Sequence, residues 1–191
     1  MQSFEPKSQE DYVRLQALRM TSLTHEYPLS PWHADVFNEF KPYLKAPVVD
    51  IGCRNGKLLD KLEEEGYEAY GIEITDLALH AQSKGRKVTQ ADIHLGVPFA
   101  DKFFKSAIIT HALEHFHNPE KALNEVKRIL DGHILIIFPG QSISEQWKDN
   151  YGHFSFFKDN DDVCELLKKV GFEIVQIYSK ANFWNTIIAK I

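Results

Sequence analysis

The sequence contains very little cysteine. Cys53 and Cys164 are the two cysteines among 191 residues, and they lie too far apart in the chain for the spacing of a metal-binding motif. A small secreted domain held together by disulfides would need more cysteines than this. We therefore expect two free thiols in a reducing, cytoplasmic environment.

Long hydrophobic runs are also lacking. No stretch approaches the roughly 18 apolar residues that are needed to cross a membrane. The first ten residues, MQSFEPKSQE, have neither the basic nor the apolar region of a secretory signal peptide. We therefore expect no membrane span and no export.

Positive charge is in deficit. The chain has 22 Lys and Arg residues against 27 Asp and Glu residues, which gives a formal net charge of −5. A broad basic surface is what nucleic-acid binding requires, so this balance disfavours nucleic acid as a partner. The hydrophobic fraction of 43% is ordinary for a globular protein, and the length is sufficient for a complete core.

The first 45 residues differ in pattern from the rest. Apolar residues recur at helical spacing over Tyr12–Met20 and again over Trp32–Leu44, with Pro28 and Pro31 between the two segments. We expect residues 1–45 to form a helical cap or lid over a domain formed by residues 46–191.

From residue 46 onward, expected strands alternate with expected helices. This alternation predicts an α/β fold, a Rossmann-like, doubly wound, mostly parallel sheet of seven strands. The connection of residues 179–182 is too short for a parallel crossover, so the last strand should run antiparallel to its neighbour. The expected strands are Pro47–Ile51, Tyr67–Glu73, Lys87–Asp92, Phe103–Thr110, His133–Phe138, Phe172–Tyr178 and Phe183–Lys190. The expected helices are Gly56–Glu65, one ending at Ser83 and capped by Thr75 or Asp76, Pro119–Leu130 capped by Asn118, and Asp161–Val170.

Acidic residues end the first three of these strands. Ligands of open α/β sheets bind beyond the carboxyl ends of the strands. Asp50 is followed by glycines that allow a tight turn, and the next helix can present its N–H groups to an anion. Glu73 lies about 20 residues after this turn, an offset suited to ribose hydroxyls. Asp92 with Ile93 suits an adenine ring. Each acid alone could equally cap a helix or face solvent, but together they predict a nucleoside site.

Two common phosphate-binding motifs are absent. Gly52 and Gly56 are one residue too close for the P-loop pattern, and Leu58 stands where that pattern has Ser or Thr after the lysine. The dinucleotide pattern G-x-G-x-x-G is also absent. A nicotinamide-dependent enzyme is therefore a disfavoured alternative.

Five segments between about residues 46 and 180 share the motifs of one known family. They are Val48–Gly56, similar to the first motif of the family; Val97–Phe104, similar to P-F-x-D-x-x-F; Leu113–Pro119, similar to L-E-H-x-x-[DN]-P; and Gly152–Phe157 and Leu166–Glu173, similar to the late region. On these segments, the chain resembles a class I S-adenosylmethionine-dependent methyltransferase of the small-molecule type (methyltransferase domain 11-like). The resemblance implies S-adenosylmethionine as cofactor and no metal.

The resemblance also implies a set of cofactor-binding residues. Two positions depart from the family pattern. Arg54 replaces the middle glycine of G-x-G-x-G, and its side chain either crowds the methionine portion of the cofactor or turns outward. Lys105 replaces an aspartate before the fourth strand. The implied residues are Asp50, Gly52, Cys53, Gly56, Glu73, Ile74, Asp92, Ile93, Thr110 and His111.

Methyl transfer needs in-line placement of the two reactants, and an oxygen acceptor also needs a base. Histidine changes its charge near neutral pH, which makes His111, His115 and His153 the candidate catalytic residues. Among them, we expect His115 or His153 to act as the base. Each also has a structural interpretation: His111 lines the cofactor site, His115 is hydrogen-bonded near the following helix, and His153 anchors its aromatic loop. A zinc site of His111, His115 and His117 is disfavoured because no cysteine lies near them.

We therefore expect an enzyme that methylates an oxygen or nitrogen atom of a small-molecule or sugar-like acceptor, free or held on a carrier. A protein acceptor is a second enzymatic possibility. The alternative from another class is a non-catalytic, methyltransferase-like partner protein, which Arg54 and Lys105 suggest.

Overall fold

The computed structural model describes residues 8–20, 38–140, 153–180 and 184–191. Most of the expected helix at residues 32–44 lies outside these ranges. Its last part is helical over residues 38–40 and continues as the 3₁₀ helix η1 (Lys41–Tyr43). Among the described residues, no helix has the length and apolar character to cross a membrane.

The described residues form a seven-stranded sheet with the order β3-β2-β1-β4-β5-β7-β6. Neighbouring strands from β3 to β5 are parallel, whereas β7 is antiparallel to both β5 and β6. This confirms the expected α/β class and the antiparallel last strand. The strands are β1 (Val48–Ile51), β2 (Ala69–Glu73), β3 (Val88–Gln90), β4 (Phe104–Thr110), β5 (Leu130–Pro139), β6 (Glu173–Lys180) and β7 (Trp184–Lys190).

The helices begin and end close to the expected positions. The Asn118 side chain accepts a hydrogen bond from the Lys121 N–H at the start of α5, and Gly171 ends α7 in the left-handed conformation. At the start of α4 it is the Thr75 hydroxyl, rather than Asp76, that accepts from the Leu77 N–H, at 3.4 Å. The helices are α1 (Gln9–Met20), α3 (Lys57–Glu64), α4 (Leu77–Ser83), α5 (Pro119–Ile129) and α7 (Asn160–Val170), with 3₁₀ helices η2 (Ile93–Leu95) and η3 (Leu113–His115).

Two expectations about strand ends were wrong. The strand expected to begin at His133 begins at Leu130, directly after α5, so Asp131 and Gly132 are part of β5. A β-carbon at Gly132 would overlap the carbonyl group of Lys105, so glycine lets the two strands approach closely here. The third strand ends at Gln90, two residues earlier than expected, because Asp92 instead caps η2 by accepting from the His94 N–H.

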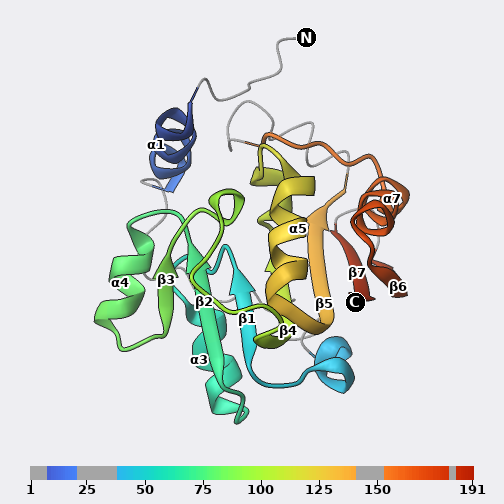
Figure 1. Ribbon diagram of the computed structural model, residues 1–191, viewed down its shortest axis with the longest axis horizontal. Coiled ribbons are helices and arrows are strands. Elements are labelled where there is room, and N and C mark those ends of the chain that lie inside the picture. The colour runs from blue at the N-terminus through green and yellow to red at the C-terminus, as the bar shows by residue number, and fades with distance from the viewer. Residues whose placement is uncertain (1–7, 21–37, 141–152, 181–183) are drawn as a thin grey trace.

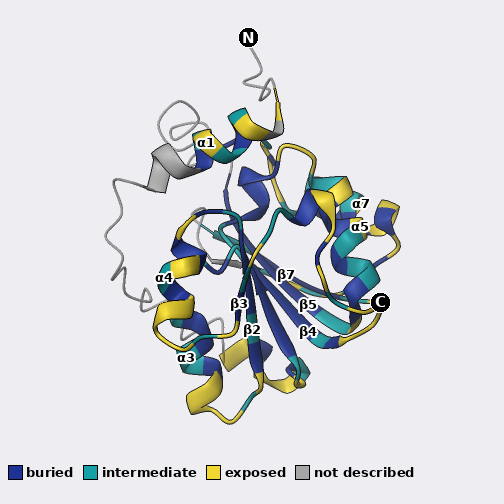
Figure 2. Ribbon diagram, turned by 60° about the vertical axis from the view of Figure 1, so that its left-hand side comes forward, coloured by how far each residue is buried: buried dark blue, intermediate teal, exposed yellow. Residues whose placement is uncertain are grey.

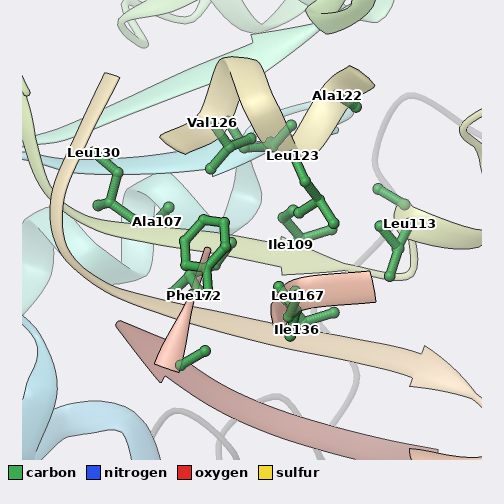
Figure 3. Packing of buried hydrophobic residues seen from close by; sticks show 14 of the residues in the cluster. Ala107, Ile109, Leu113, Ala122, Leu123, Val126, Leu130, Ile136, Leu167 and Phe172 are labelled. Atoms are coloured by element: carbon green, nitrogen blue, oxygen red, sulfur yellow. The ribbon is translucent and has the colours of Figure 1, made fainter. Parts of the chain in front are cut away.

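Helices cover both faces of the sheet and bury a separate apolar layer on each. In Figure 2, α3 and α4 lie on one side of the strands, and α5 and α7 lie on the other. Figure 3 shows Leu123 and Val126 of α5 packed toward Ala107 and Ile109 of β4. The second layer joins α3 and α4 to the opposite face and includes Phe40, which is fully buried. These two layers fix where the strands end, and therefore the position of the residues that follow them.

The first helix, α1, lies apart from the helices on the two faces, beyond one end of the sheet (Figure 1). The Tyr12 hydroxyl donates to the carbonyl oxygen of His115 at 3.0 Å, and the Gln16 amide approaches the same oxygen at 3.4 Å. This helix therefore adjoins η3, the segment that follows β4.

Candidate functional site

A pocket opens at the carboxyl ends of β1, β2 and β4. Its wall joins residues from α1, from the loops after β1 and β2, from η2 and from η3. The lining residues are Tyr12, Gln16, Ile51, Gly52, Arg54, Ile72, Glu73, Ile74, Thr75, Ala91, Asp92, Ile93, His111, Ala112, His115 and Phe116.

The loop after β1 depends on positive backbone angles. Gly52 has a φ angle of 77°, and a β-carbon there would lie 2.6 Å from the β-carbon of Ala112. Arg54, at the position of the missing glycine, has a φ angle of 53° and lines the pocket. Its N–H donates to the Glu73 carboxylate at 2.9 Å, which links the first loop to the second strand. An arginine here can be accommodated because this bond holds its backbone in the left-handed conformation.

Glu73 is the most strongly hydrogen-bonded acid of the pocket. Its side chain is 4% exposed. One carboxylate oxygen accepts from Arg54, and the other accepts from the Thr75 N–H at 2.8 Å and the Thr75 hydroxyl at 2.9 Å. These three donors fix the position of the carboxylate in the pocket wall.

The Asp92 carboxylate is held in place by His94. Its Oδ1 atom accepts from the His94 N–H at 2.9 Å and lies 2.6 Å from the ring nitrogen Nδ1 of the same histidine. Ile93 follows it directly, and both residues line the pocket as expected from the sequence. Tyr12 of α1 packs edge-on against the His94 ring, at 5.5 Å between ring centroids.

Two other expected cofactor residues lie beside the pocket, not in its wall. The Cys53 side chain is buried among apolar residues of the α3 layer, and burial raises the pKa of its thiol. Gly56 precedes α3 in the left-handed conformation. Arg86 fixes this corner, since its guanidinium donates to the Asp60 carboxylate at 2.6 Å and to the Asn55 carbonyl at 2.8 Å. The N-terminus of α3 is thus anchored directly behind the pocket.

Asp50 and Thr110, at the ends of β1 and β4, are likewise not lining residues. The Asp50 side chain is 3% exposed, and its Oδ1 atom accepts no hydrogen bond from the described residues. Burial, together with the nearby charge of Glu73, raises the pKa of Asp50 to about 7. An ionised Asp50 therefore lacks compensation until a donor or a cation approaches.

Replacing Asp50 by asparagine should stabilise the protein in a pH-dependent way. The folded chain keeps the Asp50 proton up to about pH 7, whereas the unfolded chain loses it near pH 4. Stability therefore falls as pH rises through this window. We expect Asp50→Asn to gain roughly 2–4 kcal/mol more at pH 8 than at pH 5, measured by urea unfolding. Asp76→Asn, at an exposed position, is the control. Equal gains at both pH values would contradict the raised pKa.

The three candidate histidines lie on one side of the pocket. His111 has a φ angle of 50° and lines the pocket. Its Nδ1 atom lies 3.6 Å from the Glu114 carboxylate, and its ring packs edge-on against Trp184. His115 lines the pocket from η3. His153 lies behind it, with 4.6 Å between the two ring centroids. The structure thus brings all three histidines together around Glu114.

The sequence interpretation did not identify several residues in or beside the pocket. Tyr12 and Gln16 belong to the amphipathic pattern of α1, but that pattern does not indicate which structure the helix packs against. Glu114 stands inside the segment Leu113–Pro119, yet its glutamate was not singled out. Its 2% exposure distinguishes it from a surface acid.

Comparison with known proteins gives consistent matches. The family model described as methyltransferase domain matches residues 24–177. An uncharacterized protein of Methanocaldococcus jannaschii is 30% identical over 116 residues, which are 56% of each chain, so the match spans little more than half of that relative. The structure of an S-adenosylmethionine-dependent methyltransferase from Aquifex aeolicus matches with a TM-score of 0.68 at 18% identity, over 94% of this chain and 98% of that one. A possible histamine N-methyltransferase from Thermotoga maritima matches with a TM-score of 0.69 at 20% identity, over 94% and 98%. These two structures share the fold.

Proposed function

The chain belongs to the methyltransferase domain family, and on that premise we propose that it methylates an oxygen or nitrogen atom of a small-molecule or sugar-like acceptor, free or held on a carrier. S-adenosylmethionine is the cofactor that this family and fold imply. When bound, it supplies a methyl group on a positively charged sulfur atom. The buried, hydrogen-bonded carboxylate of Glu73 in the pocket wall is the observation that carries the proposal.

The pocket residues fit this cofactor. Glu73 is fixed as an acceptor and is suited to hold two ribose hydroxyls. Asp92 and Ile93 provide an acceptor and an apolar surface for the adenine ring. Asp50, whose Oδ1 atom accepts no hydrogen bond from the described residues, is suited to a cationic or N–H donor group just behind the wall. Gly52, in the loop after β1, has no side chain, so the cofactor can approach the backbone closely there.

We propose His111 as the general base for an oxygen acceptor. His111 and His115 both line the pocket. The side chain of His111 is the more exposed of the two, at 21% against 7%. A base must both reach the acceptor and pass its proton to solvent, which favours the more exposed ring. The Glu114 carboxylate lies 3.6 Å from Nδ1 of His111. His115 is the second candidate for this role.

A small acceptor is favoured by the wall that α1 contributes. Tyr12 and Gln16 line the pocket and approach the same backbone oxygen of η3, so this helix limits the space inside the pocket. The net charge of −5 disfavours a nucleic-acid substrate. We propose that residues 1–45, which include α1, form the cap of a methyltransferase domain of residues 46–191.

The first test is calorimetric titration of the full chain with S-adenosylmethionine and S-adenosylhomocysteine, with NADH as the control ligand. We expect dissociation constants in the micromolar range for the first two and no heat from NADH. Formation of S-adenosylhomocysteine is then measured with a panel of small alcohols, amines and sugars, and should exceed the acceptor-free rate for at least one of them.

A non-catalytic binding protein is the second candidate, and the Arg54 side chain in the pocket wall favours it. Arg54→Gly separates the two functions because glycine adopts the observed φ angle without strain. If the folded wild-type chain does not bind the cofactor and Arg54→Gly does, the arginine has closed the site. Binding of NADH alone would instead contradict the proposed function.

A further inference from the structure

Three buried polar side chains form a cluster at the edge of the pocket. Glu114 and His115 come from η3, and His153 comes from the segment that precedes α7. The three residues are 2%, 6% and 4% exposed. One possible ligand atom of each lies within 4.8 Å of those of the other two. The cluster is therefore a compact group of one carboxylate and two imidazoles that is shielded from solvent.

Backbone hydrogen bonds hold the two segments of the cluster together. The N–H groups of Phe154 and Ser155 both donate to the carbonyl oxygen of Glu114, at 2.9 and 3.0 Å. The Ser155 hydroxyl donates to the carbonyl oxygen of Phe116 at 2.7 Å. His153 is thus fixed beside η3 by the residues that follow it, and the arrangement does not depend on contacts between the side chains themselves.

The Glu114 carboxylate lacks adequate partners for a buried charge. Its Oε2 atom is buried and accepts no hydrogen bond from the described residues. Its Oε1 atom lies 3.6 Å from Nδ1 of His111 and 3.8 Å from Nε2 of His115, both longer than a hydrogen bond. Buried charges are normally paired or coordinate a metal, because an uncompensated one is costly. The carboxylate therefore points to a cation that binds between the three side chains.

We propose that Glu114, His115 and His153 bind a divalent transition-metal ion, with Zn²⁺ the best match. Imidazole nitrogens favour zinc and its neighbours over magnesium and calcium, which prefer oxygen ligands. Three protein ligands leave one position of a tetrahedral ion open, as in catalytic zinc sites. Metal–ligand bonds of about 2.0–2.2 Å require the ligand atoms to approach more closely than they do here, so the proposal includes a shift of the side chains toward the ion on binding. This site does not rest on the proposed methyl transfer.

The test is calorimetric titration of Zn²⁺ into the metal-free full chain under reducing conditions. We expect one equivalent to bind with a micromolar or tighter dissociation constant. Glu114→Gln and His153→Ala should each weaken binding more than the roughly 10–100-fold that groups outside the ligand shell cost. His133→Ala is the matched control, because this histidine of β5 packs against Tyr43, away from the cluster. It should bind Zn²⁺ as the wild type does.

Substitution with Co²⁺ provides a second readout that does not depend on the stability of the variants. The wild-type chain should show visible absorption typical of nitrogen and oxygen ligands, without the charge-transfer band of a thiolate from Cys53 or Cys164. No binding of Zn²⁺ by the folded wild-type chain would overturn the proposal. So would a thiolate band, or unchanged binding in folded Glu114→Gln and His153→Ala.

Discussion

Replacing Glu73 by alanine is expected to weaken the binding of S-adenosylhomocysteine by at least about 100-fold. Each hydrogen bond to a charged group contributes roughly 1.5–3 kcal/mol, and about 1.4 kcal/mol corresponds to a factor of ten in affinity. Two ribose hydroxyls lost together account for the expected change. The same substitution releases the Arg54 and Thr75 N–H groups, which loosens the loop after β1. Calorimetric titration of the folded variant measures the effect.

Glu68→Ala is the matched control for this prediction. Glu68 immediately precedes β2 at the opposite end of the strand, where it is exposed and pairs with Lys87. Its removal should leave the affinity for S-adenosylhomocysteine within about twofold of the wild type, since exposed ion pairs contribute little. Wild-type affinity in Glu73→Ala would remove this carboxylate from the proposed cofactor site.

Replacing His111 by asparagine is expected to lower kcat by about 10²–10⁴-fold with an oxygen acceptor found in the screen. Asparagine suits this position because it tolerates the left-handed conformation, which His111 adopts with a φ angle of 50°. The variant therefore removes the base without straining the backbone. The affinity for S-adenosylhomocysteine should change by less than about tenfold, because general-base catalysis acts on turnover and not on cofactor binding.

Steady-state kinetics of S-adenosylhomocysteine formation, together with calorimetric titration, separate the two effects. His133→Asn is the control, since it removes a histidine of β5 that lies outside the pocket lining. Near-normal turnover in His111→Asn would mean that His115 acts as the base, or that positioning of the two reactants alone accounts for catalysis. A nitrogen acceptor that is already uncharged needs no base, so a small effect confined to such acceptors agrees with the same mechanism.

Local sequence patterns were sufficient for most of the fold. Asn118 marks the start of one helix, and Gly171 marks the end of another. The short connection after residue 178 requires an antiparallel last strand. The failures occurred where a specific contact in the folded chain decides what a residue does. Gly132 resembles a turn residue, but in the folded chain it allows β5 to pass close to Lys105. Asp92 resembles a strand end, but it is held by His94 as a cap.

The sequence was sufficient to predict that acidic residues gather at one edge of the sheet, because strand ends can be recognised by periodicity and all parallel strands end at one edge. Glu73, Asp92 and Ile93 lie in the pocket wall. What it could not determine was which side chains face the pocket at that edge. Cys53 lies in the motif and turns into the core, whereas Arg54 beside it lines the wall.

The packing of distant segments, which local patterns do not specify, brings several residues to the pocket. Tyr12 and Gln16 reach the pocket because α1 packs on η3, which no periodicity in α1 specifies. His153 meets Glu114 and His115 because backbone hydrogen bonds join its segment to η3. The sequence led us to expect no metal because the family resemblance implies none and because no cysteine lies near His111, His115 and His117. Spacing describes which residues are neighbours along the chain. The charge of a buried carboxylate is compensated by groups that the fold places next to it, which can come from distant segments.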